Sequence, residues 1–158
     1  MRSTIVVLAT AVAIGTAACG ATTRSTTVQT RAFPTLTSAT GTFTTLDHGK
    51  DADSALTVQL LRSNGELGAE MQSVGTQFND HASIPPFAFS VSGPFTTNDV
   101  DDGQVRLRLA ADGDDDFTFD FRMTLRFSDA TTRNFFWRGI RLDHTSPERV
   151  LTLAGGRT

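Results

Sequence analysis

The side chains of this chain that could do chemistry are aspartates and histidines, which gather in a few polar segments. Each of the three histidines directly follows an aspartate. Carboxylate oxygens are the ligands that calcium prefers, and imidazole nitrogens beside them would suit zinc or another transition metal. The predicted calcium ligands are Asp47, Asp51, Asp53, Asp80, Asp112, Asp114, Asp115 and Asp116, and the candidate transition-metal ligands are His48, His81 and His144.

A second interpretation of these residues needs no cation. Aspartate and histidine are common in turns, where each side chain can remain solvated on its own. Asp112, Asp114 and Asp116 do have the spacing of the first ligands of an EF-hand loop. However, Phe117 stands where that loop needs glycine, and Met123 stands where it needs its bidentate glutamate. An EF-hand is therefore excluded, whereas a bound cation and independently solvated loops both remain open.

The segment 117–127 predicts the longest element that positions these loops. Its apolar residues alternate without a break against polar ones, and they are Phe117, Phe119, Phe121, Met123, Leu125 and Phe127. Successive side chains of a strand point to opposite faces, so this pattern places one face in a core and the other in solvent. A helix would scatter the same rings around its circumference. The segment is therefore predicted to be a half-buried antiparallel strand.

The same period of two recurs along residues 41–154 and predicts an all-β fold, an antiparallel β-sandwich of about eight strands. Asn64-Gly65 predicts a tight hairpin, because both residues tolerate positive φ. Gly139 is the expected site of a bulge, because the apolar parity changes there. A further hairpin is expected around Gly113, which would place Arg106 opposite Asp120 on the outer face.

The loops of such a sandwich alternate between its two ends, which groups the candidate ligands. If the loop 47–54 marks one end, three further loops join it, and these are 74–84, 110–116 and 143–149. The loops predicted to lie at the opposite end are 62–66, 92–103 and 128–134. The first group contains every histidine and all the candidate calcium ligands, so the sequence predicts one acidic end.

The first residues predict export. A positive start, an apolar run and a small-residue exit over residues 1–18 are typical of a secretory signal peptide. Cys19, the only cysteine, follows two alanines and resembles the lipobox of bacterial lipoproteins, which implies that Cys19 is lipidated and becomes the mature N-terminus. The alternative is secretion with an unmodified cysteine. Residues 19–40, rich in threonine and serine, are predicted to form the lipidated cysteine and a flexible tether.

The composition gives no sign of catalysis or of nucleic-acid binding. The formal net charge of −3 includes no basic excess, which argues against a nucleic-acid partner. The sequence lacks G-x-S-x-G, a phosphate loop, HExxH and CxxC, and its serines, histidines and aspartates have no spacing that implies a triad. Trp137, with Arg138 and Arg141 beside it, is either a stacking platform for a sugar or lipid headgroup or a core residue with arginines reaching outward.

Two segments resemble the PLAT-type β-sandwich of lipoxygenases and lipases. Residues 51–65, Asp-Ala-Asp-Ser-Ala-Leu-Thr-Val-Gln-Leu-Leu-Arg-Ser-Asn-Gly, are similar to its opening strand, and 125–129 with 137–142 look like its closing pair. The resemblance implies docking to membranes or proteins, often assisted by calcium, and no catalysis.

Together these features predict a non-catalytic module that is exported to the bacterial cell envelope. It would be secreted or held at the membrane through the lipid on Cys19, and it would bind an envelope protein, lipid or glycan, with calcium as its candidate cofactor. The alternatives are a metal-dependent envelope enzyme that uses the aspartate and histidine loops, or a purely structural surface component.

Overall fold

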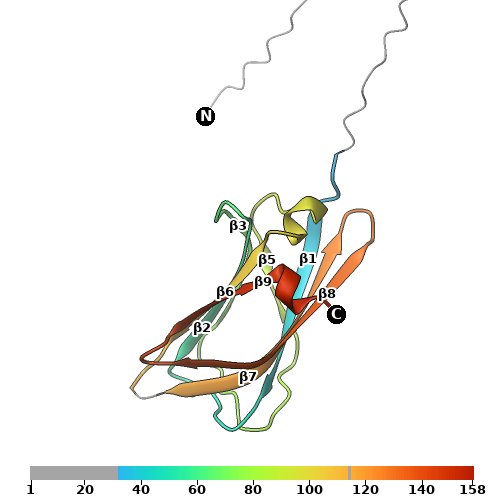
Figure 1. Cartoon of the computed structure of the whole chain (residues 1–158). Helices are drawn as coiled ribbons and strands as arrows, with labels where there is room; N and C mark the ends of the chain where they lie inside the picture. The colour runs from blue at the N-terminus through green and yellow to red at the C-terminus, as the bar shows by residue number, and fades with distance from the viewer. Residues whose placement is uncertain (1–31, 114) are drawn as a thin grey trace, which may run out of the picture. The chain divides into compact units, whose positions relative to one another are not determined.

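The computed structural model describes residues 32–113 and 115–158, which form two antiparallel sheets packed face to face (Figure 1). The first sheet has the order β4-β1-β7-β8 and the second the order β5-β3-β2-β6-β9. The strands are β1 (Leu36–Thr45), β2 (Ala55–Leu61), β3 (Leu67–Ser73), β4 (Phe87–Ala88), β5 (Ser90–Val91), β6 (Gln104–Ala110), β7 (Asp116–Phe127), β8 (Thr132–Asp143) and β9 (Glu148–Thr152). Two short helices are η1 (Thr97–Val100) and α1 (Leu153–Gly156). The predicted all-β sandwich is confirmed.

Strand β7 has the alternation that its sequence predicts. Its six apolar side chains are at most 1% exposed, and the polar residues between them face outward. Their rings pack with Phe43 of β1, which lies 4.8 Å from Phe121 and 5.4 Å from Phe119 between ring centroids. The core is therefore an aromatic layer between the two sheets.

The strand β1 begins inside the segment that was predicted to be a tether. It starts at Leu36 rather than at 41, and it pairs with β7 along its length. Its inward residues include the small Ala39 and Gly41, and at Gly41 the rings of Phe121 and Phe89 occupy the space that a side chain would fill. A Cβ on Gly41 would lie 2.9 Å from Cε2 of Phe121. Because these inward residues are small, β1 shows no clear alternation of large apolar and polar residues in its sequence.

The expected hairpin around Gly113 is wrong. Strand β6 pairs with β2 and β9, whereas β7 pairs with β1 and β8, so the segment between them passes from one sheet to the other. The predicted pair of Arg106 and Asp120 is accordingly absent. Arg106 instead lies 3.5 Å from Glu148. The two strands do bury the faces that were predicted, but they belong to different sheets and are not edge-to-edge neighbours.

Two local predictions are confirmed. Strands β2 and β3 form the hairpin at Asn64-Gly65, and Gly65 has a φ of 82°. The register of β7 and β8 shifts between Phe119 and Phe121, where Gly139 has a φ of 59°. The Gly139 amide donates to Oδ1 of Asp120 at 2.8 Å, which fixes the bulge and lets the buried side of β8 pass from Trp137 to Ile140.

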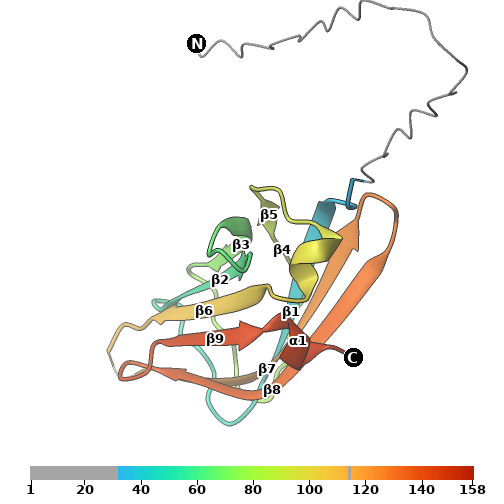
Figure 2. The same cartoon turned by 45° about the horizontal axis from the view of Figure 1, so that its top comes forward.

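The end of the chain crosses from the second sheet back to the first. After β9, helix α1 lies beside β8, and Phe135 forms a bridge with Arg157 (Figure 2). The backbone amide of Leu153 donates to the carbonyl of Gly103 at 3.0 Å, and Nε1 of Trp137 donates to the Thr152 carbonyl at 3.3 Å. This segment covers one side of the core between the sheets.

The loops divide between the two ends as predicted. At one end the Asp51 amide donates to Oδ2 of Asp115 at 3.3 Å, and the Leu109 amide donates to the Pro147 carbonyl at 2.8 Å. We call this end, formed by the loops 46–54, 74–84, 111–115 and 144–147, the acidic pole. At the other end the Ser128 amide donates to the Thr35 carbonyl at 2.8 Å. We call this end, with residues 32–35 and the loops 62–66, 92–103 and 128–131, the N-terminal pole.

Candidate functional site

The acidic pole contains an open depression of about 440 Å³. The residues that line it are Asp47, His48, Gly49, Asp51, Asp80, Asp112, Asp115 and Asp116. They come from three loops and the start of β7, which the antiparallel topology brings to one end of the sandwich. The structure thus gathers six of the eight predicted calcium ligands around one opening.

Apart from His48, the remaining predicted site residues either do not line the depression or fall outside the described residues. Asp53 is exposed and does not line the depression. Asp114 and the predicted lipidation site Cys19 fall outside the described residues. His81 is exposed, with Nε2 4.0 Å from Oδ1 of Asp47, and His144 is exposed in the turn between β8 and β9. Of the three candidate transition-metal ligands, His48 therefore lines the depression with the carboxylates, His81 lies beside Asp47 without lining it, and His144 lies apart.

Several of the gathered carboxylates already serve the local structure. Oδ1 of Asp80 accepts the Gly49 amide at 2.6 Å, which joins two loops, and Oδ2 of Asp115 accepts the Asp51 amide. Oδ2 of Asp116 pairs with Nη2 of Arg141 at 2.8 Å. Within residues 32–113 and 115–158, no three acidic, histidine or cysteine side chains are placed together closely enough to hold a metal ion. In this conformation the carboxylates tie loops together, and they do not form a ready coordination shell.

Besides the exposed Arg141, which pairs with Asp116, the structure places a buried cation at this end, the ammonium of Lys50, the only lysine of the chain. The residue is completely buried. Its Nζ donates to the carbonyl of Asp51 at 2.6 Å and to that of Ser54 at 2.5 Å, and it lies 5.3 Å from the centroid of the Phe78 ring. These are the kinds of contact by which a small cation is held.

The environment of Lys50 acts on its charge in two directions. Burial lowers the pKa of the ammonium, and the carboxylates of Asp115, Asp53 and Asp51 act in the opposite direction. The net effect is a lowered pKa, so desolvation outweighs the attraction of the carboxylates. Lys50 is thus an internal counterion, because it brings one positive charge beneath the acidic loops.

Replacing Lys50 should test this role. We expect Lys50→Met to lower the free energy of unfolding by about 1–3 kcal/mol, because two buried carbonyls lose their donor. Calcium should then raise the melting temperature of the variant more than that of the wild type, since the carboxylates of Asp51, Asp53 and Asp115 have lost a positive charge that acts on them. Thermal melts with calcium and with chelator measure both effects.

The control for this experiment is Arg108→Met on the outer face of β6, which removes an exposed positive charge. It should change stability by less than about 0.5 kcal/mol. A Lys50→Met variant as stable as the control would contradict the counterion role of Lys50.

The structure also settles the two readings of Trp137. Its side chain is 9% exposed, and its ring stacks on Phe121 and Phe135 at centroid distances of 5.7 and 5.8 Å. The interpretation of Trp137 as a stacking platform is therefore wrong, and Trp137 is a core residue. Arg138 and Arg141 are exposed, as the core interpretation predicted.

A feature that the sequence reading missed lies on the outer face of β7 and β8. Phe136 is half-buried there, and the guanidinium carbons of Arg122 and Arg138 lie 4.1 and 5.0 Å from its ring centroid. A signal was present, because Phe136 has the opposite parity to the buried Phe135 and Trp137 and must face outward in a strand. This aromatic residue and its arginines form a second candidate site.

Comparison with known proteins adds no assignment, since no family model and no curated protein matches this sequence. In the part of the chain that the structure describes, no helix is both long and apolar enough to cross a membrane.

Proposed function

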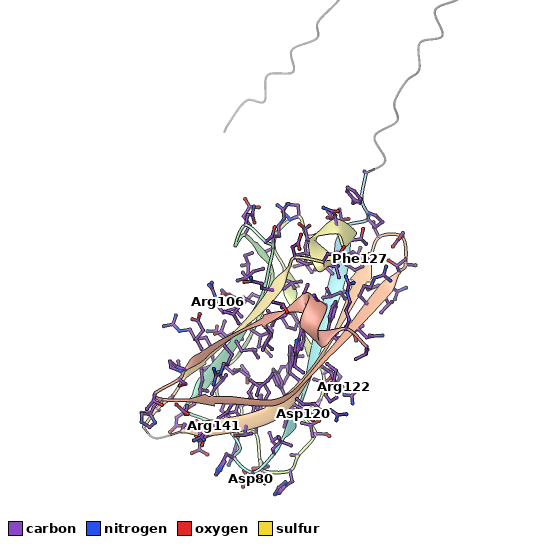
Figure 3. The ribbon with its side chains drawn as sticks, viewed as in Figure 1. Asp80, Arg106, Asp120, Arg122, Phe127 and Arg141 are labelled. Atoms are coloured by element: carbon purple, nitrogen blue, oxygen red, sulfur yellow. The ribbon has the colours of Figure 1, made fainter. Side chains whose placement is uncertain are left out.

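We propose that this chain is a non-catalytic binding module of the bacterial cell envelope, exported and held at a membrane by a lipid on Cys19. The observation that carries the proposal is where the described domain begins. Thr35 bonds to Ser128 and bridges Thr96, so the chain enters the sandwich at the N-terminal pole. Figure 3 places Asp80, at the acidic pole, at the far end of the sandwich from Phe127, beside the N-terminal pole. An anchor at Cys19 would therefore leave the acidic pole and both outer sheet faces free for a partner.

The arrangement of charges supports binding over catalysis. The carboxylates of Asp80, Asp115 and Asp116 accept hydrogen bonds that hold loops and strands together, which leaves them poorly placed to exchange protons with a substrate. A metal-dependent enzyme would need several histidines beside these carboxylates, whereas His48 alone of the three histidines lines the depression and His144 lies in the exposed turn between β8 and β9. A surface that presents fixed charges to a partner fits these contacts better.

Calcium binding at the acidic pole is the second part of the proposal. Six carboxylates from different loops line one opening, and the resemblance to PLAT-type sandwiches implies calcium-assisted docking to a lipid or protein. Bound calcium would reduce the repulsion between them that Lys50 offsets only in part. The calcium melts described for Lys50 test this part: a wild-type melting temperature unmoved by calcium or chelator would favour independently solvated loops.

The anchoring is tested by replacing the lipidation site. When the full chain is expressed in a bacterial host, we expect it to sediment with membranes and to be released by detergent. We expect Cys19→Ser to appear in the soluble exported fraction, because a single thioether-linked anchor is removed. Fractionation and immunoblotting measure the distribution.

The matched control is Ser25→Ala, which alters the same N-terminal segment but leaves the cysteine. Its distribution should equal that of the wild type. A wild-type chain that is already soluble after export would favour the alternative of secretion with an unmodified cysteine.

A further inference from the structure

The outer face of β7 and β8 carries positive charge in a chain whose net charge is −3. The outward residues Arg122 and Arg126 on β7 and Arg138 on β8 are exposed, and they surround Phe136 and the pair of Thr124 and Asn134. We call this set of six residues the arginine face. Figure 3 shows Arg122 on the outside of this sheet, on the opposite side of the molecule from Arg106.

These three arginines have no carboxylate within 4.0 Å in the described part of the chain, unlike several other arginines. Arg141 pairs with Asp116, Arg106 with Glu148 and Arg62 with Asp99. The nearest outward acid on the same strand is Asp120, whose Oδ1 already accepts the Gly139 amide. The arginine face therefore keeps a local excess of positive charge that an anionic partner could neutralise.

Two of the arginines are held in place before any partner binds. The guanidinium groups of Arg122 and Arg138 both lie over the ring of Phe136, at 4.1 and 5.0 Å from its centroid. Such stacking restrains a guanidinium group and leaves its N–H donors at the edge free, so less side-chain entropy is lost when it binds a carboxylate. The arrangement suits the recognition of planar anionic groups.

The residues next to the arginine face indicate which other chemical groups the partner carries. Next to β7, strand β1 presents outward hydroxyls at Thr40, Thr42 and Thr44, and Thr124 donates to Asn134 at 3.0 Å. These groups offer hydrogen bonds over an extended, flat surface, which suits a chain of sugar hydroxyls. A bilayer would need apolar side chains to insert, but Phe136 lies beneath two guanidinium groups. The large exposed apolar residues of the described chain lie before β1 or on and beside the second sheet, and they are Phe33, Val74, Val91 and Val150.

We propose that the arginine face binds an anionic polysaccharide, with Arg122 and Arg138 pairing to its carboxylates and the threonines of β1 contacting its hydroxyls. This inference rests on the proposed function, because it names the partner class of that envelope module. Guanidinium groups form bidentate hydrogen bonds with carboxylates, and exposed pairs of this kind weaken as salt rises.

The test measures binding of the full chain to polygalacturonate, with neutral dextran as the uncharged control polymer. We expect binding to polygalacturonate alone, weakening as sodium chloride is raised. The double variant Arg122→Gln/Arg138→Gln should lose affinity by at least about tenfold, because two charge-assisted contacts are removed. The control variant Arg106→Gln/Arg108→Gln removes the same charge from the opposite sheet and should stay within about twofold of the wild type. Thermal melts establish that both variants are folded.

Three results would overturn the inference. These are no binding to polygalacturonate, equal losses in the two double variants, or stronger binding to phosphatidylglycerol vesicles than to polygalacturonate. No binding would exclude the anionic polysaccharide as partner, and equal losses would exclude the arginine face as its site. Stronger binding to vesicles would make a lipid surface the partner. Failure of the anchoring experiment on Cys19 would leave these binding results unchanged, so the two proposals can fail separately.

Discussion

Phe43→Ala should lower the free energy of unfolding by about 4 kcal/mol, the range found for large aromatic side chains removed from a core. Phe43 is completely buried and lies in the second half of β1. Its ring contacts five other rings, at centroid distances from 4.8 to 6.3 Å, and these are Phe78, Phe87, Phe117, Phe119 and Phe121. Alanine would leave a cavity that these rings, held on β4, on β7 and in the loop 74–84, can fill only in part. Denaturant unfolding of the purified chain measures the change.

The matched control is Phe33→Ala, because Phe33 is 59% exposed and precedes β1. That variant should lose less than about 0.5 kcal/mol. If Phe43→Ala were no more destabilising than Phe33→Ala, the aromatic layer between the sheets would not be the core of this domain.

Asp99→Ala should be the second most damaging change, lowering the free energy of unfolding by about 2–3 kcal/mol at neutral pH. Asp99 lies in η1 at the N-terminal pole, and its side chain is 9% exposed. Oδ2 accepts the Thr96 amide at 2.7 Å and the Thr96 hydroxyl at 2.8 Å, and Oδ1 accepts Nε of Arg62 at 3.0 Å. The substitution removes this acceptor for three donors and leaves the Arg62 guanidinium without its less exposed partner.

The effect of Asp99 should depend on pH. Desolvation raises the pKa of this carboxyl, but the hydrogen bonds from Thr96 and the pairing with Arg62 together outweigh it, so the net pKa is lowered. A lowered pKa in the folded state stabilises the fold fully above the unfolded value of about 3.9 and loses that stabilisation as the pH falls through the folded pKa. The difference between wild type and Asp99→Ala should therefore be largest at neutral pH and shrink below about pH 4.

The control for the pH series is Asp102→Ala, an exposed acid a few residues further along the chain. It should differ little from the wild type at any pH. A loss of stability in Asp99→Ala that was equal at pH 7 and pH 3 would show that the carboxylate does not act through its charge.

The fold was largely predictable because a strand that buries one face alternates apolar and polar residues along its sequence. The segment from Phe117 to Phe127 shows this alternation in large residues. The turn at Asn64-Gly65 and the bulge at Gly139 are each indicated by a glycine, and both glycines adopt a positive φ. The start of β1 shows no such alternation of large apolar residues. Its inward residues Ala39 and Gly41 are small, and at Gly41 the rings of Phe121 and Phe89 fill the space, which is a property of the neighbouring segments rather than of β1.

Whether β6 and β7 pair with each other could not be predicted from alternation. Alternation tells which face of a strand is buried, but two strands that face each other across a core have the same pattern as two hairpin neighbours. A short segment such as 111–115 can close a hairpin or cross between sheets. The choice was made by other contacts: β2 and β9 flank β6, and β1 and β8 flank β7.

The candidate site was predictable in position but not in detail. The rule that successive loops alternate between the two ends of the sandwich correctly placed Asp51, Asp80 and Asp115 at one pole. The burial of Lys50 depends on the carbonyls of Asp51 and Ser54 turning inward, and nothing in the residue types indicates that turn. The arginine face depends on which strands are neighbours, because Arg122 and Arg138 meet over Phe136 only when β7 and β8 pair in this register.

The most direct test of an anchored envelope module is the intact mass of the wild-type chain extracted from membranes of a bacterial host. We predict a mature chain that begins at Cys19 and is heavier than residues 19–158 by the mass of attached lipid, with Cys19→Ser lacking that increment. A mass equal to the unmodified chain, whether it begins at Met1 or after the signal segment, would contradict the account.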